Sequence, residues 1–398
     1  MKFGGTSVAN SGLIMKAAAR VARMQRAKND VVVVVSAMGH TTDELMMLSR
    51  EITQYPPARE LDMLLTAGER ISVSLFSMAL EKLNLQAVSF TGSQVGIITD
   101  NRHTDARIME IRGERLKKAI AEHKIPVVCG FQGVSMEKEI TTLGRGGSDT
   151  TAVAISAALA AKSCIIYTDV EGVYTEDPNR FRGVKKIGKI SYEEMLELAS
   201  HGAQVLHPRA SGIAARYRIP VEIKSGFNNK SGTTVMHLEG VEHPKPKAIT
   251  HSEDLYLVTL VQVPKKPTYL SQIVTDLTEH GIHLKFFFHG ISDAKKFDLS
   301  FITPLNEKKK VKTILKPVIK RLKIASLKEV TDVCSISVIG LGIGSDNRVL
   351  SEVFNILSRA KAHIEAVTTS ELSLNIFLHR KYVNRAINSL LQRFDLRA

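Results

Sequence analysis

Short apolar runs alternate with amphipathic stretches along the first 240 residues. Five consecutive valines at residues 31–35 are typical of a buried strand, and similar runs occupy residues 125–129 and 164–167. Between such runs, apolar residues recur at helical spacing, and residues 64–80 read as one helix. Strands that alternate with helices indicate a mostly parallel sheet covered by helices. We therefore expect one α/β domain over residues 1–240.

The pattern changes after residues 242–247, which read EHPKPK and have the composition of a linker. Beyond them the order strand, helix, strand, strand, helix occurs twice. These repeats predict two small α+β domains, at residues 250–328 and 331–398. Neither copy carries a set of residues that suggests catalysis.

The strongest chemical signal is a glycine-rich turn before an alanine-rich helix, in TTLGRGGSDTT at residues 141–151. Gly144, Gly146 and Gly147 let backbone N–H groups approach a ligand closely. A helix N-terminus favours negative charge, and Arg145 adds a fork that can bind a carboxylate through two hydrogen bonds. The motif indicates an anion site. A glycine-rich turn also occurs without a ligand, so this motif alone leaves both interpretations open.

Other polar residues follow the predicted strands, where ligands collect in open α/β sheets. Lys2 stands beside two glycines in KFGGTSV, and Ser36 and Thr42 follow the valine run. Glu69 comes early in an otherwise apolar helix. Its carboxylate either faces solvent in the first turn or points at a cationic ligand.

The formal net charge of +14 invites a nucleic-acid interpretation. Much of the excess lies in residues 307–328, where apolar residues recur at helical spacing. The lysines there are therefore expected to form the solvated face of an amphipathic helix. Tryptophan is absent and aromatic residues are not interleaved with the basic ones, which argues against a stacking platform for bases. We expect no nucleic-acid partner.

Composition also argues against a secreted or membrane protein. No window approaches 18 uncharged apolar residues, and the first residues contain no apolar signal-peptide core. Cys129, Cys164 and Cys334 are too widely spaced for a disulfide framework or a zinc motif. We expect a cytoplasmic protein.

Six motifs along the chain together resemble the aspartate kinases of the amino acid kinase family, over nearly the whole length. They are KFGGTSV, SAMGHTTDEL, TAGER, TTLGRGGSDT, YTDVEGVYTEDP and GAQVLHP, in that order. The resemblance implies a three-layer α/β sandwich followed by two ferredoxin-like ACT domains. It implies transfer of the γ-phosphoryl group of Mg-ATP to the side-chain carboxylate of L-aspartate. This would be the first step of lysine, diaminopimelate, threonine and methionine biosynthesis. Feedback by an amino acid, lysine first, and a homodimer or tetramer through residues 250–398 are also implied.

The resemblance also implies roles for individual residues. Lys2 would bridge the transferring phosphoryl oxygens and Asp149 would hold Lys2. Arg145 would bind the substrate carboxylate and Glu69 its α-ammonium group. Mg²⁺ would arrive with the nucleotide, without a side-chain metal site. His207 stands before Pro208, and we expect it to form a structural corner rather than to act as a catalytic base. The remaining expected contacts are Ser36, Thr42, Gly146, Gly147 and Ser148 for aspartate, and Phe3, Gly4, Gly5, Thr168, Asp169, Tyr174, Asp177 and Lys224 for the nucleotide.

Two departures from the family pattern leave more than one interpretation open. Only Met1 precedes Lys2, where family members have several strand residues, so either the start is late or the first central strand is short, and the placement of Lys2 is loosened. The first repeat lacks the glycine that commonly opens its helix, so the identity of the feedback ligand stays open: lysine is the first expectation, and loss of inhibition is the alternative. Two different activities also stay open: a kinase acting on glutamate, carbamate or UMP, and a catalytically weak amino-acid-sensing subunit. The LGRGGSD arginine and the tandem repeats argue against the former.

Overall fold

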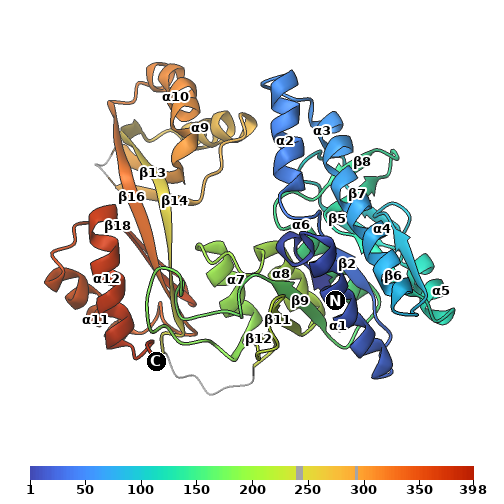
Figure 1. Ribbon diagram of the computed structural model, residues 1–398. Coiled ribbons are helices and arrows are strands. Elements are labelled where there is room, and N and C mark those ends of the chain that lie inside the picture. The colour runs from blue at the N-terminus through green and yellow to red at the C-terminus, as the bar shows by residue number, and fades with distance from the viewer. Residues whose placement is uncertain (239–244, 292–294) are drawn as a thin grey trace. The chain divides into compact units, whose positions relative to one another are not determined.

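The structure is a computed structural model that describes residues 1–238, 245–291 and 295–398 (Figure 1). It divides into two compact units. The first unit comprises Met1–Pro178 and Val184–Val241, and the second comprises Asn179–Gly183 and Glu242–Ala398. The chain therefore leaves the first unit for five residues and returns to it. The predicted linker at 242–247 lies partly outside the described residues.

An eight-stranded sheet forms the centre of the first unit, in the order β10-β12-β11-β9-β1-β2-β6-β3. All its pairings are parallel except that of β11 with β12, which confirms the prediction of a mostly parallel sheet. Its strands are β1 Lys2–Phe3, β2 Val33–Val35, β3 Ala87–Phe90, β6 Ile125–Cys129, β9 Cys164–Thr168, β10 Lys189–Ile190, β11 Val221–Ser225 and β12 Thr233–Val235.

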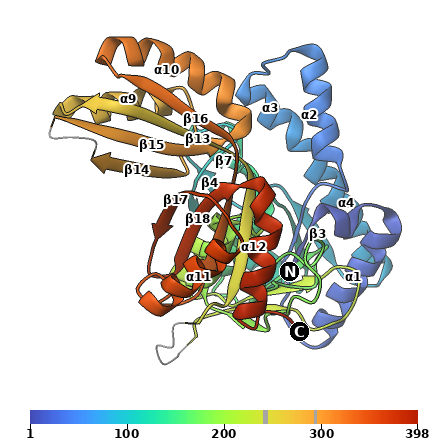
Figure 2. The same cartoon turned by 90° about the vertical axis from the view of Figure 1, so that its left-hand side faces the viewer.

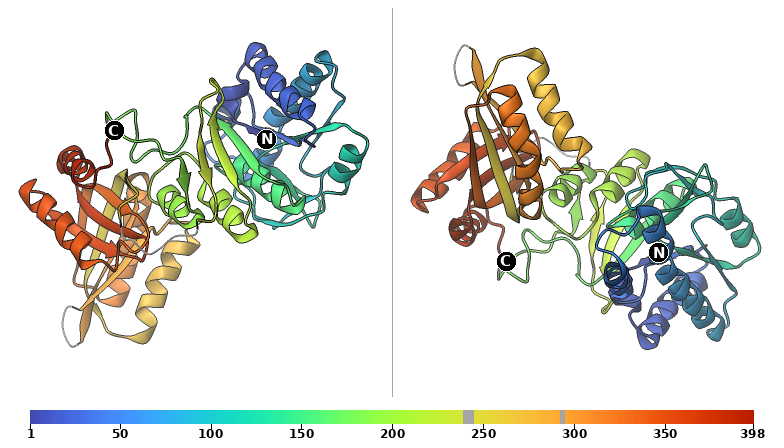
Figure 3. Two further views of the ribbon diagram at one scale, coloured as in Figure 1. Left: turned by 90° about the horizontal axis from the view of Figure 1, so that it is seen from below. Right: turned by 90° about the horizontal axis from the view of Figure 1, so that it is seen from above.

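Helices cover both faces of this sheet, as Figure 3 shows. The helices of the first unit are α1 Ser11–Arg26, α2 Thr41–Ile52, α3 Ala58–Leu65, α4 Ala67–Lys82, α5 Glu114–Ala121, α6 Gly147–Ala158, α7 Tyr192–Ser200 and α8 Pro208–Tyr217, with a 3-10 turn η1 at Gly5–Val8. The helix expected over residues 64–80 begins only at Ala67. Thr66, which follows α3, separates the two helices.

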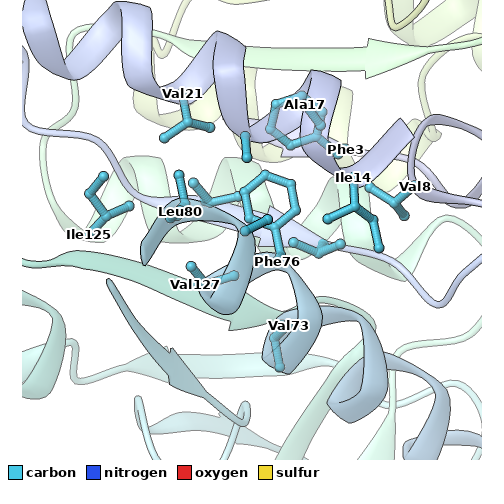
Figure 4. Close-up of a cluster of buried hydrophobic side chains, with 14 of the residues drawn as sticks. Phe3, Val8, Ile14, Ala17, Val21, Val73, Phe76, Leu80, Ile125 and Val127 are labelled. Atoms are coloured by element: carbon cyan, nitrogen blue, oxygen red, sulfur yellow. The ribbon is translucent and has the colours of Figure 1, made fainter. Parts of the chain in front are cut away.

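The two side chains of β1 point to opposite faces of the sheet, and this decides where Lys2 lies. Phe3 points into the core beneath α1 and α4, where it contacts Phe76 and stacks on Tyr167 (Figure 4). Successive side chains of a strand point to opposite faces, so Lys2 points to the face that α6 covers. Lys2 pairs with Val34 on β2 and Ile166 on β9. Despite its short length, β1 is thus held on both sides.

A smaller sheet lies beside the main one, in the order β5-β4-β7-β8. Its strands are β4 Ile97–Thr99, β5 Ile108–Ile111, β7 Gln132–Ser135 and β8 Ile140–Thr142. Strand β8 leads directly into the glycine-rich turn before α6.

Within the described chain, the stretch Ala58–Lys82 is long and apolar enough to cross a membrane, judged by length and composition. More than half of its most apolar window, 56%, is buried inside the protein. The core helices of a globular domain have the same properties, so the observation is weak evidence for a membrane span.

One six-stranded antiparallel sheet, in the order β14-β15-β13-β16-β18-β17, forms the second unit (Figure 2). Its elements are β13 Ala248–Pro264, α9 Pro267–Glu279, β14 Phe286–Ile291, β15 Lys296–Pro304, η2 Leu305–Glu307, α10 Lys308–Leu322, β16 Ser326–Ile339, α11 Asn347–Arg359, β17 Ile364–Thr369, β18 Ser373–His379 and α12 Arg380–Arg393. The predicted order of strands and helices is present in both repeats.

The longest strands of the two repeats, β13 and β16, pair with each other. Residues 248–252 of β13 pair with residues 335–339 of β16, and residues 257–261 pair with residues 326–330. Strand β16 therefore runs without a break through the predicted boundary between 328 and 331. Sequence periodicity identifies each element but not its partner, and the pairing of distant strands decides where one repeat ends.

Candidate active site

A cavity of about 310 Å³ opens at the carboxyl ends of β1 and β2, beside the N-terminus of α6. It brings together many of the residues predicted from the motifs: Lys2, Gly5, Ser36, Thr42, Glu69, Arg145, Gly146, Gly147, Ser148 and Asp149. Gly144 of the predicted anion motif lines it too, as do Ala37, Gly39 and Phe131, which were not among the predicted site residues. Phe131 follows the end of β6, and the rule that ligands collect at strand ends could have indicated it.

A buried ion pair lies at the base of this cavity. The ammonium nitrogen Nζ of Lys2 is 2.7 Å from Oδ1 of Asp149, and the two side chains are only 10% and 14% exposed. Asp149 stands in the first turn of α6, where helix N-termini favour acidic side chains. A Cβ atom at Gly4 would lie 3.4 Å from Nζ of Lys2, so the glycine leaves the space beside the ammonium open.

Glycine is required where two loops of the cavity touch. A Cβ atom at Gly5 would lie 2.8 Å from the carbonyl oxygen of Ala37 and 3.0 Å from that of Gly39. The N–H of Gly39 donates to the carbonyl of Gly5 over 3.0 Å. The loops after β1 and β2 therefore pack backbone against backbone, and the N–H groups beside Lys2 are held in place.

The carboxylate of Glu69 does not face solvent, because the residue is only 2% exposed. Its Oε1 accepts a hydrogen bond of 3.2 Å from the N–H of Ala37, whereas its buried Oε2 has no partner among the described residues. Burial raises the pKa of Glu69 from 4.5 to about 7, although backbone hydrogen bonds oppose the shift. A buried carboxylate with one unpaired oxygen in a cavity wall suits a cationic group of a ligand.

The raised pKa of Glu69 predicts a pH-dependent stability. The folded protein holds this proton more tightly than the unfolded chain, so stability falls as pH rises from about 4.5 to about 7. Glu69→Gln should therefore raise the Tm relative to wild type at pH 8 and have little effect at pH 5. Thermal denaturation at both pH values measures this, with Glu81→Gln, an exposed change in α4, as the control. An equal Tm difference at both pH values would contradict the assignment.

Two glycines of the glycine-rich turn have a backbone conformation that other residues rarely adopt. Gly144 and Gly146 have φ values of +73° and +70°, in the left-handed region that favours glycine. A Cβ atom at Gly147 would lie 2.9 Å from the ring of Phe131. Between the first two glycines, Arg145 lines the cavity with an exposed side chain. The N–H of Gly147 donates to the carbonyl oxygen of Gly144 over 3.0 Å. The next N–H groups of the first turn lie where a helix has no carbonyl partners of its own, so this end of the cavity can bind an anion.

Most residues predicted for the nucleotide lie outside this cavity. Thr168 ends β9, and its hydroxyl donates to Asp169 over 3.0 Å. The Tyr174 hydroxyl donates to Glu171 over 3.4 Å, and Lys224 on β11 pairs with Glu222 at 2.6 Å. The remaining predicted residues outside the cavity are Phe3, Gly4 and Asp177.

The ends of β9 and β11 therefore carry polar groups on the other side of β1. Gly226 brings them close to the loop after β1, since a Cβ atom there would lie 2.2 Å from the hydroxyl oxygen of Ser7. The Phe3 side chain belongs to the core, so only its backbone can meet a nucleotide. Lys230 also lies here, paired at 2.8 Å with Glu171. The motifs singled out neither residue of that pair.

The described residues contain no group of three His, Cys, Asp or Glu side chains that could hold a metal ion. Mg²⁺ keeps several waters and is commonly bound by one or two carboxylates together with substrate phosphates.

Known proteins resemble this chain over its full length. A model of the amino acid kinase family matches residues 1–225. An aspartokinase of Bacillus sp. (strain MGA3) is 40% identical over 396 residues, which cover 99% of this chain and 96% of that protein.

Solved structures share the fold of both units. The crystal structure of E. coli aspartokinase III in complex with aspartate and ADP, in the R-state, aligns with a TM-score of 0.82 and 24% identity over 98% of each chain. The same enzyme in complex with lysine and aspartate, in the T-state, aligns with a TM-score of 0.74 and 24% identity, over 99% of this chain and 98% of that one.

Proposed function

Because the chain belongs to the amino acid kinase family, in its aspartokinase branch, we propose that it phosphorylates L-aspartate with ATP to give 4-phospho-L-aspartate and ADP. One observation carries the proposal. A single cavity holds a buried, unpaired carboxylate oxygen at Glu69 and the cationic groups of Lys2 and Arg145. This is the charge pattern needed by an amino acid whose second carboxylate meets a phosphate.

The proposed binding mode follows from charge. The α-ammonium group of aspartate would meet the free oxygen of Glu69, and the α-carboxylate would meet the guanidinium of Arg145. Ser36 and Thr42 would contact the substrate from the loop after β2. This leaves the side-chain carboxylate directed at Lys2 and the loop containing Gly4 and Gly5.

The chemistry needs no general base, because a carboxylate of ordinary pKa is ionised at neutral pH. A carboxylate oxygen of aspartate forms a bond to the γ-phosphorus, and the bond from phosphorus to the β,γ-bridging oxygen breaks. The electron pair leaves with ADP, and no proton is transferred. Catalysis then rests on positioning and on neutralising charge. Lys2, held by Asp149, would stabilise the oxygens of the transferring group.

The nucleotide would extend from Lys2 toward the ends of β9 and β11. Thr168, Asp169, Tyr174, Asp177 and Lys224 remain the proposed contacts of its base, ribose and distal phosphates. When bound, Mg²⁺ would neutralise phosphate charge and fix the orientation of the triphosphate. The chain itself supplies the backbone N–H group of Gly5 and the ammonium of Lys2. The expected N–H contact from Gly4 is not free in this structure, because that N–H donates to the carbonyl oxygen of Tyr167 over 3.1 Å.

Regulation and assembly are further parts of the proposal. The second unit repeats one small α+β module, and E. coli aspartokinase III, which has the same fold, is known in complex with lysine. We propose an amino-acid effector, lysine first, bound by residues 250–398. The unit's sheet has β14 and β17 at its edges, and exposed edges commonly pair with another chain. A homodimer or tetramer through this unit and a cytoplasmic location complete the proposal.

A hydroxamate assay tests the reaction directly, because hydroxylamine traps an acyl phosphate as it forms. We expect ATP-dependent hydroxamate with L-aspartate, none with L-glutamate, and less with aspartate when lysine is added. If glutamate gave as much product as aspartate, the enzyme would not be specific for aspartate. No product from aspartate would favour the sensing subunit, and activity unaffected by lysine would remove lysine as the effector.

A further inference from the structure

Arg209 is a largely buried cation that does not line the proposed substrate cavity. Its guanidinium donates to the carbonyl oxygen of Leu143 at 2.6 Å and to that of Ala106 at 2.7 Å. It also lies 3.3 Å from a carboxylate oxygen of Asp105, and its side chain is 17% exposed. Leu143 immediately precedes the glycine-rich turn, so Arg209 joins the start of that turn to the loop at 104–106.

The first turn of α8 positions Arg209 beside Leu143. Pro208 occupies the first helical position, and His207 is the N-cap, accepting a hydrogen bond from the N–H of Arg209 over 3.3 Å. The His207 ring also packs on the turn, since a Cβ atom at Gly146 would lie 2.3 to 2.5 Å from its atoms. Burial and the charge of Arg209 lower the pKa of His207, which favours the neutral ring that can accept this bond. The segment His-Pro-Arg therefore contacts the turn on both sides of Arg145.

Asp62 holds the same region from the opposite direction. This carboxylate on α3 is fully buried. It accepts hydrogen bonds of 2.5 Å from the hydroxyl of Thr142, 3.1 Å from the N–H of Thr104 and 2.8 Å from the His103 ring. A Cβ atom at Gly144 would lie 3.0 Å from the carbonyl of Thr104, so that loop is also packed directly on the turn.

We propose that Arg209 is a positioning residue for the substrate carboxylate, acting through Arg145 rather than on the substrate itself. Asp62 fixes the strand that enters the glycine-rich turn, His207 fixes the middle of the turn, and Arg209 ties Leu143 to the neighbouring loop. A side chain as long as Arg145 can hold a carboxylate through two bonds only when its backbone is fixed. The inference rests on the proposed function, because it assigns aspartate to the cavity.

The matched variants Arg209→Leu and Arg209→Lys test this role in the full-length protein. Arg209→Leu should raise the KM for aspartate about tenfold, since a misplacement of about 1 Å at a site can cost up to 10²-fold. The KM for ATP should change less than twofold, because Arg209 contacts the loops beside the aspartate cavity and not the residues proposed for the nucleotide. Arg209→Lys keeps a donor for one carbonyl and should recover part of the loss. Arg216→Leu, an exposed change on the same helix, is the control.

A double-mutant cycle separates positioning from general destabilisation. In an Arg145→Ala background, Arg209→Leu should no longer change the KM for aspartate. An undiminished effect in that background, or a parallel rise of both KM values, would overturn the inference. If the wild-type protein phosphorylates aspartate but Arg209→Leu leaves the KM for aspartate unchanged, this inference is overturned and the proposed function is not. A wild-type protein that makes no acyl phosphate from aspartate would overturn the proposed function and this inference together.

Discussion

Lys2→Met is expected to lower kcat for phosphorylation of aspartate by about 10²- to 10³-fold, the cost of removing one donor aimed at developing charge. The proposed role of Lys2 is realised in the transition state, so the KM for aspartate should change much less. Methionine has a similar volume and keeps the apolar part of the side chain. Steady-state kinetics with both substrates varied measure the effect, with Lys16→Met, an exposed change in α1, as the control.

The ion pair with Asp149 provides a way to separate catalysis from folding. Lys2→Met alone leaves the largely buried carboxylate of Asp149 without its cation, so it should also lower the Tm. The double variant Lys2→Met, Asp149→Asn removes both charges and should recover most of the Tm but none of the activity. Recovery of activity in the double variant would show that Lys2 only neutralises Asp149.

Local sequence signals predicted much of the site because each depends on a few neighbouring residues. The glycines of LGRGGSD indicated a turn with close backbone approach, and two of them have the left-handed backbone that glycine adopts readily. The amphipathic spacing in residues 307–328 predicted α10, whose buried residues are Val311, Ile314, Leu315, Val318 and Leu322. The position of Glu69 limited its role to two possibilities, and burial excludes the one in which the carboxylate faces solvent.

The parts that could not be predicted depend on contacts between distant residues. Asp62 meets Thr142 across 80 positions, and Arg209 meets Leu143 across 66. No spacing rule connects such pairs, and a buried Asp in a helix or an Arg after His-Pro reads as an ordinary residue. The same applies to β13 and β16, whose shared pairing cannot be derived from the periodicity of either strand. The nucleotide contacts rest on motif resemblance, since the cavity at β1 does not include them.

Arg145→Ala is expected to lower kcat/KM for aspartate about 100-fold, since hydrogen bonds to charged groups contribute about 1.5 to 3 kcal/mol each. Arg145→Lys keeps the charge but loses the planar fork, and should lower it about tenfold. The Tm of both variants should stay close to that of wild type, because Arg145 is exposed. Arg26→Ala, an exposed change at the end of α1, controls for loss of surface charge.

A substrate analogue identifies the group that Arg145 binds. β-Alanine retains the ammonium group and the reacting carboxylate of aspartate but lacks the α-carboxylate. Wild type should therefore prefer aspartate over β-alanine by about the factor lost in Arg145→Ala, roughly 100-fold by the same hydrogen-bond energies. The variant should use the two substrates almost equally. If Arg145→Ala instead lowered kcat/KM for β-alanine as much as for aspartate, Arg145 would act on the phosphoryl group. The α-carboxylate would then have to be bound by other groups that line the cavity, such as those in the first turn of α6.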